Sequence, residues 1–432
     1  MQFVLPEATR KRDKYYPRHF KVVSDYFSDI HWADSPQSVQ TGQWSIVVRS
    51  PGYQGLGRET ARKYGIDSAF DLLSPEEVDA IKQRRGNIIL DLGWEMLNPA
   101  PSVVKSLAQT MDELELDPTR VFIFHSNQNA RDQFSRNWIE ETGSPPPSSL
   151  EFPVAMALCV VHHQKNRDDR RIIDRREQSL RRTTDGSRSR LFNSFNGEVR
   201  PHRLYVAAAL ESLGILDRGY FSLLYPRKSA KESDQEFRAR SLKIVGKLPR
   251  GNEFQEAAGS ILARLPMGLD LGGLPSGGVE QIAWVSQDPS YYDDSRFSLV
   301  IDTSVSDSDS LFVTEKVLKP IMNHSPFLLV GSSGGANLLR SYGFQTFEPH
   351  IRQCETGSYE EVVHCAVEEL ERLSRLSESE LDALSRALTE ACDHNAAQFW
   401  NSFPAILRHK LEQCLLALGP QAAASAARSQ TR

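Results

Sequence analysis

Two adjacent charged residues, Glu315 and Lys316, have the side chains and spacing in this sequence that best suit ligand binding. They follow Thr314, which can cap a helix, and a helix N-terminus attracts phosphate through its unpaired N–H groups. Lys316 adds a mobile cation, while a carboxylate such as Glu315 accepts hydrogen bonds from vicinal sugar hydroxyls. This combination suits a sugar nucleotide. A plainer interpretation is that Glu315 complements the helix dipole and Lys316 is solvated.

The elements expected around these residues would place them at the edge of a parallel sheet. The apolar run 297–301 predicts a buried strand, and residues 326–330 predict a second one. The second strand ends in the glycine turn 331–335, which includes Gly334 and opens a helix at 336–342. This order predicts a right-handed βαβ unit, whose ligands lie outside the carboxyl ends of the strands.

The same segments resemble the donor-domain signature of GT-B glycosyltransferases. Residues 312–316, FVTEK, and 326–331, PFLLVG, are most similar to the pattern of the α1,3-fucosyltransferase family. A longer pattern found in a group of bacterial glycosyltransferase-like proteins is matched by KPI at 319–321, LR at 339–340 and GFQTF at 343–347. The resemblance covers roughly residues 190 to 350. It implies an α/β fold of the GT-B type, with two Rossmann-like domains facing across a cleft and helices at the C-terminus.

The resemblance also implies residues that bind the donor. In these families an arginine early in the donor domain meets the donor diphosphate, and Arg203 is the best match, with Arg200 second. The planar guanidinium can bond two phosphate oxygens at once, although an ordinary arginine in a first helical turn is the alternative. The expected donor-binding residues are Arg203, Thr314, Glu315, Lys316, Lys319 and Gly334.

An inverting transferase needs a general base, which we expect from the first domain. Asp91, Glu95 and His125 follow or end predicted strands there. Similar bacterial proteins often carry an acidic residue just past the same strand, which favours Glu95. His125 has a suitable ordinary pKa, near 6.5. We interpret His162 and His163, which follow an apolar stretch expected to be a strand, as structural. A retaining mechanism would need no such base, and the sequence leaves this open.

We expect no metal site and no cofactor. Asp307-Ser308-Asp309 is similar to a metal-binding DxD motif, but that motif belongs to a different glycosyltransferase fold. Here it lies in a serine-rich turn, where Asp and Ser favour local hydrogen bonds. In the GT-B arrangement, cations and helix N-termini stabilise the leaving nucleotide.

Composition indicates a globular protein of two domains with 432 residues. The net charge of −5 argues against a nucleic-acid partner. Five cysteines, an odd number without CxxC spacing, predict reduced thiols in a cytoplasm. No signal peptide and no membrane-spanning run is evident. We therefore expect a cytoplasmic protein, with peripheral contact at the inner membrane left open.

Alternating strands and helices predict a Rossmann-like acceptor domain at 1–163. Residues 164–190 form a basic connector, either solvated or an electropositive wall facing an anionic donor, acceptor or lipid. The donor domain spans 191–403, with a strand at 191–195 and a turn at Asn196-Gly197. We expect a helix at 404–420 that can cross back to the first domain, and a disordered tail at 421–432.

The expected function is glycosyl transfer from a nucleotide-sugar, with a GDP-sugar favoured and UDP- and CMP-sugars open. A glycan or lipid-linked glycan is the expected acceptor, in envelope polysaccharide synthesis. The alternatives are a non-catalytic sugar- or nucleotide-binding module on the same fold, and a nucleotide-sugar epimerase or phosphorylase.

Overall fold

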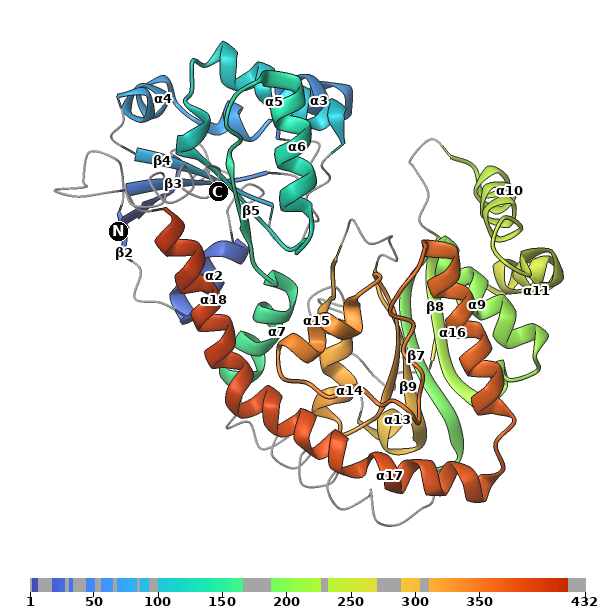
Figure 1. Cartoon of the computed structure of the whole chain (residues 1–432). Helices are drawn as coiled ribbons and strands as arrows, with labels where there is room; N and C mark the ends of the chain where they lie inside the picture. The colour runs from blue at the N-terminus through green and yellow to red at the C-terminus, as the bar shows by residue number, and fades with distance from the viewer. Residues whose placement is uncertain are drawn as a thin grey trace. The chain divides into compact units, whose positions relative to one another are not determined.

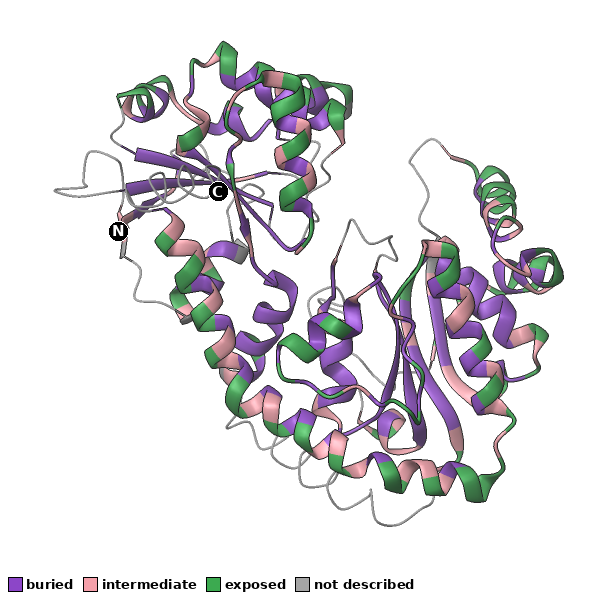
Figure 2. Ribbon diagram, viewed as in Figure 1, coloured by how far each residue is buried: buried purple, intermediate pink, exposed green. Residues whose placement is uncertain are grey.

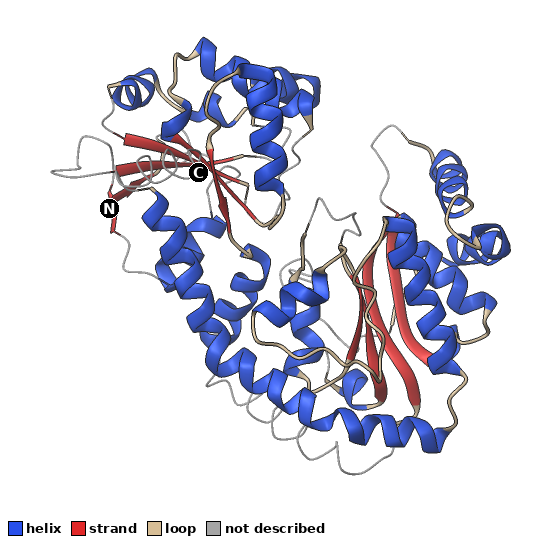
Figure 3. Ribbon diagram, in the orientation of Figure 1, coloured by secondary structure: helices blue, strands red, loops and turns tan. Residues whose placement is uncertain are grey.

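The computed structural model describes residues 2–6, 18–27, 31–33, 44–50, 56–64, 68–83, 86–92, 100–165, 188–226, 232–269, 289–303 and 311–418. The chain divides into two compact units (Figure 1). Unit 1 comprises residues 1–161 and 404–432, and unit 2 comprises residues 162–403. Each unit contains one parallel sheet with helices packed on it (Figure 3).

The sheet of unit 1 has six parallel strands in the order β2-β1-β3-β4-β5-β6. Their bounds are β1 Gln2–Val4, β2 His31–Ala33, β3 Trp44–Arg49, β4 Gly86–Asp91, β5 Val121–His125 and β6 Ser148–Glu151. Every residue of β4 and β5 is buried, as expected for parallel strands covered on both faces (Figure 2).

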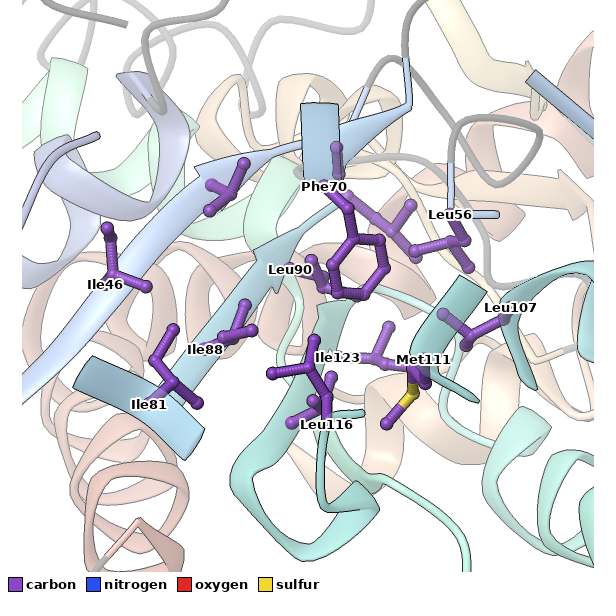
Figure 4. Packing of buried hydrophobic residues seen from close by; sticks show 14 of the residues in the cluster. Ile46, Leu56, Phe70, Ile81, Ile88, Leu90, Leu107, Met111, Leu116 and Ile123 are labelled. Atoms are coloured by element: carbon purple, nitrogen blue, oxygen red, sulfur yellow. The ribbon is translucent and has the colours of Figure 1, made fainter. Parts of the chain in front are cut away.

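The helices of unit 1 are α2 Arg18–Phe27, α3 Arg58–Tyr64, α4 Pro75–Lys82, α5 Pro101–Glu113, α6 Ala130–Thr142, α7 Val154–Lys165 and α18 Phe403–Ala417. The last residues of α7, from His162, are assigned to unit 2. Unit 1 also has two 3-10 turns, η4 Ala69–Leu72 and η5 Pro118–Arg120. The sequence signals the start of α4, where Ser74 and Glu77 form a capping box. Apolar side chains from strands and helices pack in one core (Figure 4), including Ile46, Ile88, Leu90, Ile123, Phe70, Ile81, Leu107 and Met111.

The sheet of unit 2 has four parallel strands in the order β10-β9-β7-β8, namely β7 Arg190–Val199, β8 Gly219–Pro226, β9 Ser295–Ile301 and β10 Phe327–Val330. Its helical elements are α9 Pro201–Ser212, η6 Leu216–Arg218, α10 Asp234–Val245, α11 Gly251–Arg264, α13 Ser290–Asp293, η7 Glu315–Val317, α14 Leu318–Met322, α15 Gly335–Ser341, α16 Tyr359–Ser374, α17 Glu378–Ala397 and the π-helix η8 Gln398–Ser402. The α/β prediction, with a parallel sheet in each half of the chain, is confirmed.

The side chain of Gln353 bonds the backbone of β10 at the edge of the unit 2 sheet. The side-chain oxygen of Gln353 accepts a hydrogen bond from the backbone N–H of Leu329 at 3.1 Å. Its side-chain nitrogen donates to the backbone oxygen of Phe327 at 2.9 Å. Gln353 is buried, so these two bonds satisfy both ends of its amide inside the fold.

Two predictions about local structure are wrong. Residues 154–165 form helix α7, so His162 and His163 lie on a helix and do not follow a strand. A continuous apolar run fits either a buried strand or a buried helix, and periodicity alone cannot separate them. Asn196 and Gly197 lie inside β7, where pairing of Asn196 with Leu223 of β8 overrides the turn preference of the dipeptide.

The prediction that all cysteines are reduced is also wrong, because Cys354 and Cys365 form a disulfide. They are eleven residues apart and lack CxxC spacing, and the fold brings the loop before α16 back onto that helix. Cys159, Cys392 and Cys414 are free thiols. Among the described residues, no helix is both long and apolar enough to cross a membrane.

Candidate functional site

The residue that organises the candidate site in unit 2 is Asp302, which directly follows β9 and is 1% exposed. Its carboxylate accepts hydrogen bonds from the backbone N–H groups of Thr303, at 2.6 Å, and Thr314, at 3.0 Å. It also accepts one from the Thr314 hydroxyl. Hydrogen bonds to an ionised acceptor are about twice as strong as neutral ones. Asp302 therefore fixes the Thr314-Glu315-Lys316 step against the carboxyl end of β9.

Thr314 caps a shorter helix than the sequence suggests. The step opens the 3-10 turn η7, followed by the five residues of α14. The Thr314 hydroxyl lies 3.5 Å from the backbone nitrogen of Lys316, at the limit of a hydrogen bond. Few peptide dipoles align in elements this short, so the positive charge at this corner comes mainly from side chains.

Arg203, in the first turn of α9, reaches the same corner through Asp302. One terminal nitrogen of its guanidinium donates to the backbone oxygen of Glu198 at 3.0 Å, and the other donates to that of Asp302 at 3.1 Å. The Nε2 atom of His202 lies 3.1 Å from the same Asp302 oxygen. Arg203 is 2% exposed. Its guanidinium therefore holds the backbone around Asp302 in place and is not open to solvent.

Burial controls the charges beneath the site. It lowers the pKa of Arg203 to about 10, with a further contribution from nearby Arg200, and the guanidinium stays protonated at neutral pH. Burial, followed by the charge of Arg203, lowers the pKa of His202 to about 3. His202 is therefore neutral and can donate its Nε2 proton to the Asp302 oxygen.

Lys316 and Glu315 are the half-buried charges of the site. The Nζ atom of Lys316 donates to the Thr303 hydroxyl at 2.8 Å. Within the described part of the chain, no carboxylate oxygen lies within 4.0 Å of that nitrogen. Burial, with repulsion from Arg203, lowers the pKa of Lys316 to about 7, and burial raises the pKa of Glu315. A bound anion would relieve the cost of desolvating the ammonium.

Lys319 lies on the inner side of α14, where it is 7% exposed. Together with Lys316 and Pro320 it lines a small cavity against the sheet, opposite Asn193 of β7 and Ser298 of β9. The cavity measures about 20 Å³, close to the space that one water needs. Lys319 therefore points toward the strands, and a ligand the size of a nucleotide does not fit in this cavity.

The glycine turn after β10 is held within the fold. The backbone N–H of Gly334 donates to the backbone oxygen of Glu355 at 2.7 Å. The backbone N–H of Gly335 donates to the backbone oxygen of Ser332 at 2.9 Å. The φ angle of Gly334 is +80°, which explains the glycine. Since both N–H groups have protein partners, this turn offers less to a phosphate than the sequence suggests.

The base candidates of unit 1 lie at the carboxyl ends of neighbouring strands. Asp91 ends β4 and His125 ends β5, and both are fully buried. The Nε2 atom of His125 lies 2.6 Å from the Ser149 hydroxyl, and burial lowers the pKa of His125 to about 3. A histidine this weakly basic is a poor proton acceptor at neutral pH.

Several other predicted features lie outside the described residues. These are Glu95, Asp307 to Asp309, most of the basic connector (residues 166–187) and the tail from residue 419. Among the described residues, no group of three or more His, Cys, Asp or Glu side chains could hold a metal ion.

Sequence reasoning missed Asp302, His202 and Glu151. Asp302 directly follows the apolar run of β9, and a polar residue at the carboxyl end of a buried strand is the signal that could have identified it. Glu151 has the same signal: it ends β6 and pairs with His125. Burial raises the pKa of Glu151 to about 7, the range of a group that can exchange protons at neutral pH.

Comparison with known proteins gives similarities of structure only. No family model matches the chain, and no curated protein matches it by sequence. The N-terminal domain of Candida albicans trehalose-6-phosphate phosphatase superposes with a TM-score of 0.40 and 12% identity, covering 87% of this chain and 71% of that one.

Two synthase structures are similar to the same degree. The UDP-forming trehalose-phosphate synthase of Burkholderia xenovorans gives a TM-score of 0.40 and 12% identity, covering 89% of this chain and 75% of that one. That of Burkholderia vietnamiensis gives 0.39 and 14%, covering 88% and 76%. Scores this low say nothing about the substrate of this chain, whose own strands and helices define it as an α/β protein with two parallel sheets.

Proposed function

We propose that this protein is a GT-B glycosyltransferase that moves a sugar from a nucleotide-sugar to a glycan or lipid-linked glycan acceptor. The observation that carries the proposal is the position of Lys316. It is a half-buried ammonium at the carboxyl end of β9, beside Glu315, with no carboxylate within 4.0 Å among the described residues. A protein gains little from desolvating such a cation unless an anion binds there.

The arrangement supports a division of work between neighbouring side chains. Lys316 would contact the donor diphosphate, and Arg203 would add positive charge from beneath. Glu315 would accept hydrogen bonds from sugar or ribose hydroxyls. Asp302 positions both through Thr303 and Thr314. As the bond to the sugar breaks, charge grows on the leaving diphosphate, and cations fixed in advance stabilise it without an obligatory metal.

The sequence resemblance favours a GDP-sugar as donor, with UDP- and CMP-sugars as alternatives. Envelope polysaccharide synthesis is the pathway that we propose for the product. An alternative on the same fold is binding of nucleotide or sugar without catalysis. A second is epimerisation of the donor.

Isothermal titration calorimetry with GDP, UDP and CMP tests the donor site. We expect one of these three nucleotides to bind, and we expect Lys316→Ala to weaken its binding by about 10- to 100-fold, the effect of losing one charge-assisted hydrogen bond. Glu315→Ala should weaken the binding of the nucleotide-sugar more than the binding of the free nucleotide. Lys243→Ala, on the exposed surface of α10, is the matched control and should change nothing. Unchanged binding in Lys316→Ala would disprove the assignment.

Product analysis separates the three functions. The protein is incubated with the nucleotide-sugar that binds, with and without glycan and lipid-linked acceptors. A transferase forms a glycosylated acceptor and shows only slow hydrolysis without one. An epimerase converts the donor sugar without any acceptor, and a binding module leaves the donor intact.

A further inference from the structure

Unit 1 contains a cavity that is distinct from the candidate donor site. It lies between β6, the first turn of α6 and one side of α18, and measures about 800 Å³. Arg131, Glu151, His409, Lys410 and Cys414 are among its lining residues. Pockets of about 300–1,000 Å³ are typical of sites for small molecules. All of its described lining residues belong to unit 1.

The spacing of residues on α18 explains how the helix forms one wall. Ile406, Lys410, Cys414 and Ala417 follow each other at intervals of four, four and three residues, so they share one side of the helix. Leu407 and Leu411, on another side, are 0% exposed. The helix is therefore anchored by its leucines, while the wall toward the cavity stays partly accessible.

The cavity combines positive charge with one carboxyl group, Glu151, that has an open acceptor atom. Arg131 and Lys410 supply two cations, and His409 can supply a third when protonated. The Oε1 atom of Glu151 is buried and accepts no hydrogen bond among the described residues. Burial raises the pKa of Glu151 to about 7, against the lowering effect of Arg131. Positive charge therefore exceeds negative charge near neutral pH.

The remaining lining has the character that a sugar ring requires. Ser148, Ser149 and Gln413 offer hydrogen-bonding groups, and Leu150 and Ile406 offer apolar surface. Hydroxyl groups need donors and acceptors, while the C–H groups of a ring pack on apolar side chains. An unsubstituted sugar would make no use of the positive charge of Arg131 and Lys410, and inorganic phosphate would leave the apolar lining unused.

We propose that this cavity binds a small anionic sugar, a hydroxylated ring that carries one carboxylate or phosphate group. Arg131 and Lys410 hold the anionic group, and Glu151 and the serine hydroxyls bond the ring hydroxyls. The proposal does not depend on the proposed function, because no residue of the candidate donor site takes part.

Titration calorimetry with four probes tests the ligand class: glucuronate, a hexose 6-phosphate, glucose and inorganic phosphate. We expect at least one of the two anionic sugars to bind at least tenfold more tightly than glucose or phosphate, and the comparison of the two identifies the anionic group. Arg131→Ala and Lys410→Ala should each weaken binding at least tenfold. Arg136→Ala, an exposed arginine on the same helix α6, is the control and should bind normally.

Alkylation of Cys414, which lines the cavity, tests whether the ligand binds there. Cys159 and Cys392 are buried, so Cys414 is the most accessible free thiol among the described residues. Burial raises its pKa to about 12, so iodoacetamide should label it slowly, at a rate measurable at pH 9. The bound anionic sugar should slow this labelling at least fivefold, and Cys414→Ala supplies the blank.

The proposal is overturned if neither anionic sugar binds, or if binding survives both Arg131→Ala and Lys410→Ala and leaves Cys414 labelling unchanged. Circular dichroism confirms that each variant is folded. Nucleotide titration of the same variants separates the two proposals, because these substitutions should leave nucleotide binding intact.

Discussion

At the scale of single residues, the ammonium of Lys316 carries the most chemical information. Burial lowers its pKa to about 7, so it is mostly charged at pH 6 and mostly neutral at pH 9. We expect nucleotide affinity to fall as pH rises through this range, because the neutral amine loses its attraction for phosphate. Lys316→Arg, which stays charged, should remove most of this fall. Calorimetry at pH 6, 7, 8 and 9 measures both, and identical pH profiles would contradict the prediction.

The same pKa has a consequence for stability. A lysine in the unfolded chain titrates near 10.5, so between about pH 7 and 10.5 the unfolded state binds more protons at this position. Lys316 alone therefore makes the free energy of unfolding rise with pH in that window.

Asp302 is the residue whose loss should disturb the donor site most. Asp302→Asn should lower the free energy of unfolding of unit 2 by about 2–3 kcal/mol, because a charged acceptor of several hydrogen bonds becomes neutral. Thr314→Val removes the hydroxyl bond to Asp302 and the weak contact with the Lys316 backbone nitrogen, and it should lower the free energy of unfolding by about 1–2 kcal/mol. Urea unfolding measures both. Thr389→Val, in the middle of α17, is the control, and an equal loss there would contradict the special role of Asp302.

The sequence identifies Glu315 and Lys316 as site residues because their charges stand at a recognisable strand-to-helix step. It does not show what Asp302, His202 and Glu151 contact, although Asp302 directly follows a buried strand and Glu151 ends one. Their roles depend on which strands are neighbours, and His202 comes within 3.1 Å of Asp302 across 100 residues of chain. Spacing along the chain carries no signal for such a contact.

At the scale of elements, strands between clear turns were predictable, as β4, β5 and β9 show. Helix starts with a serine cap were also predictable, as at α4 and α17. Helix α7 was not, because its residues are apolar on nearly every side and lack the period of a surface helix. The extent of β7 depends on its neighbours β8 and β9, which the local sequence does not contain.

The disulfide between Cys354 and Cys365 ties the loop after α15 to α16 and closes a short loop. Replacing both cysteines with serine should lower the free energy of unfolding of unit 2 by about 2–3 kcal/mol, because the unfolded chain regains the freedom that the bond removes. Urea unfolding without reductant measures this. Dithiothreitol should destabilise the unsubstituted protein by a similar amount and leave the double variant unchanged. An equal effect of dithiothreitol on both proteins would argue against the bond.

At the scale of the whole molecule, unit 1 is discontinuous in sequence. Its last helix, α18, buries Leu407 and Leu411, and the Leu418 oxygen accepts a hydrogen bond from the Asn87 side chain at 3.3 Å. A chain that ends at Phe403 keeps the buried ring that packs on Tyr342 and Phe344 in unit 2. This shortened chain should lose stability in unit 1, while the unfolding transition of unit 2 stays unchanged.

Urea unfolding followed by hydrogen exchange with mass spectrometry resolves the two units. A chain that ends at Leu418 is the control, and it should unfold like the full chain because it keeps the described contacts of α18. If the chain ending at Phe403 retains normal protection in β4 and β5, the discontinuous arrangement is contradicted.

The two bonds from Gln353 to β10 also matter for how one molecule meets another. An edge strand with open N–H and C=O groups is a template on which a strand from a second molecule can add, and this is a common route to aggregation. The Gln353 amide takes the N–H of Leu329 and the oxygen of Phe327, so it occupies the bonding positions that an incoming strand would use. The Gln353 side chain thus makes these two backbone groups of β10 unavailable to a strand from a second molecule.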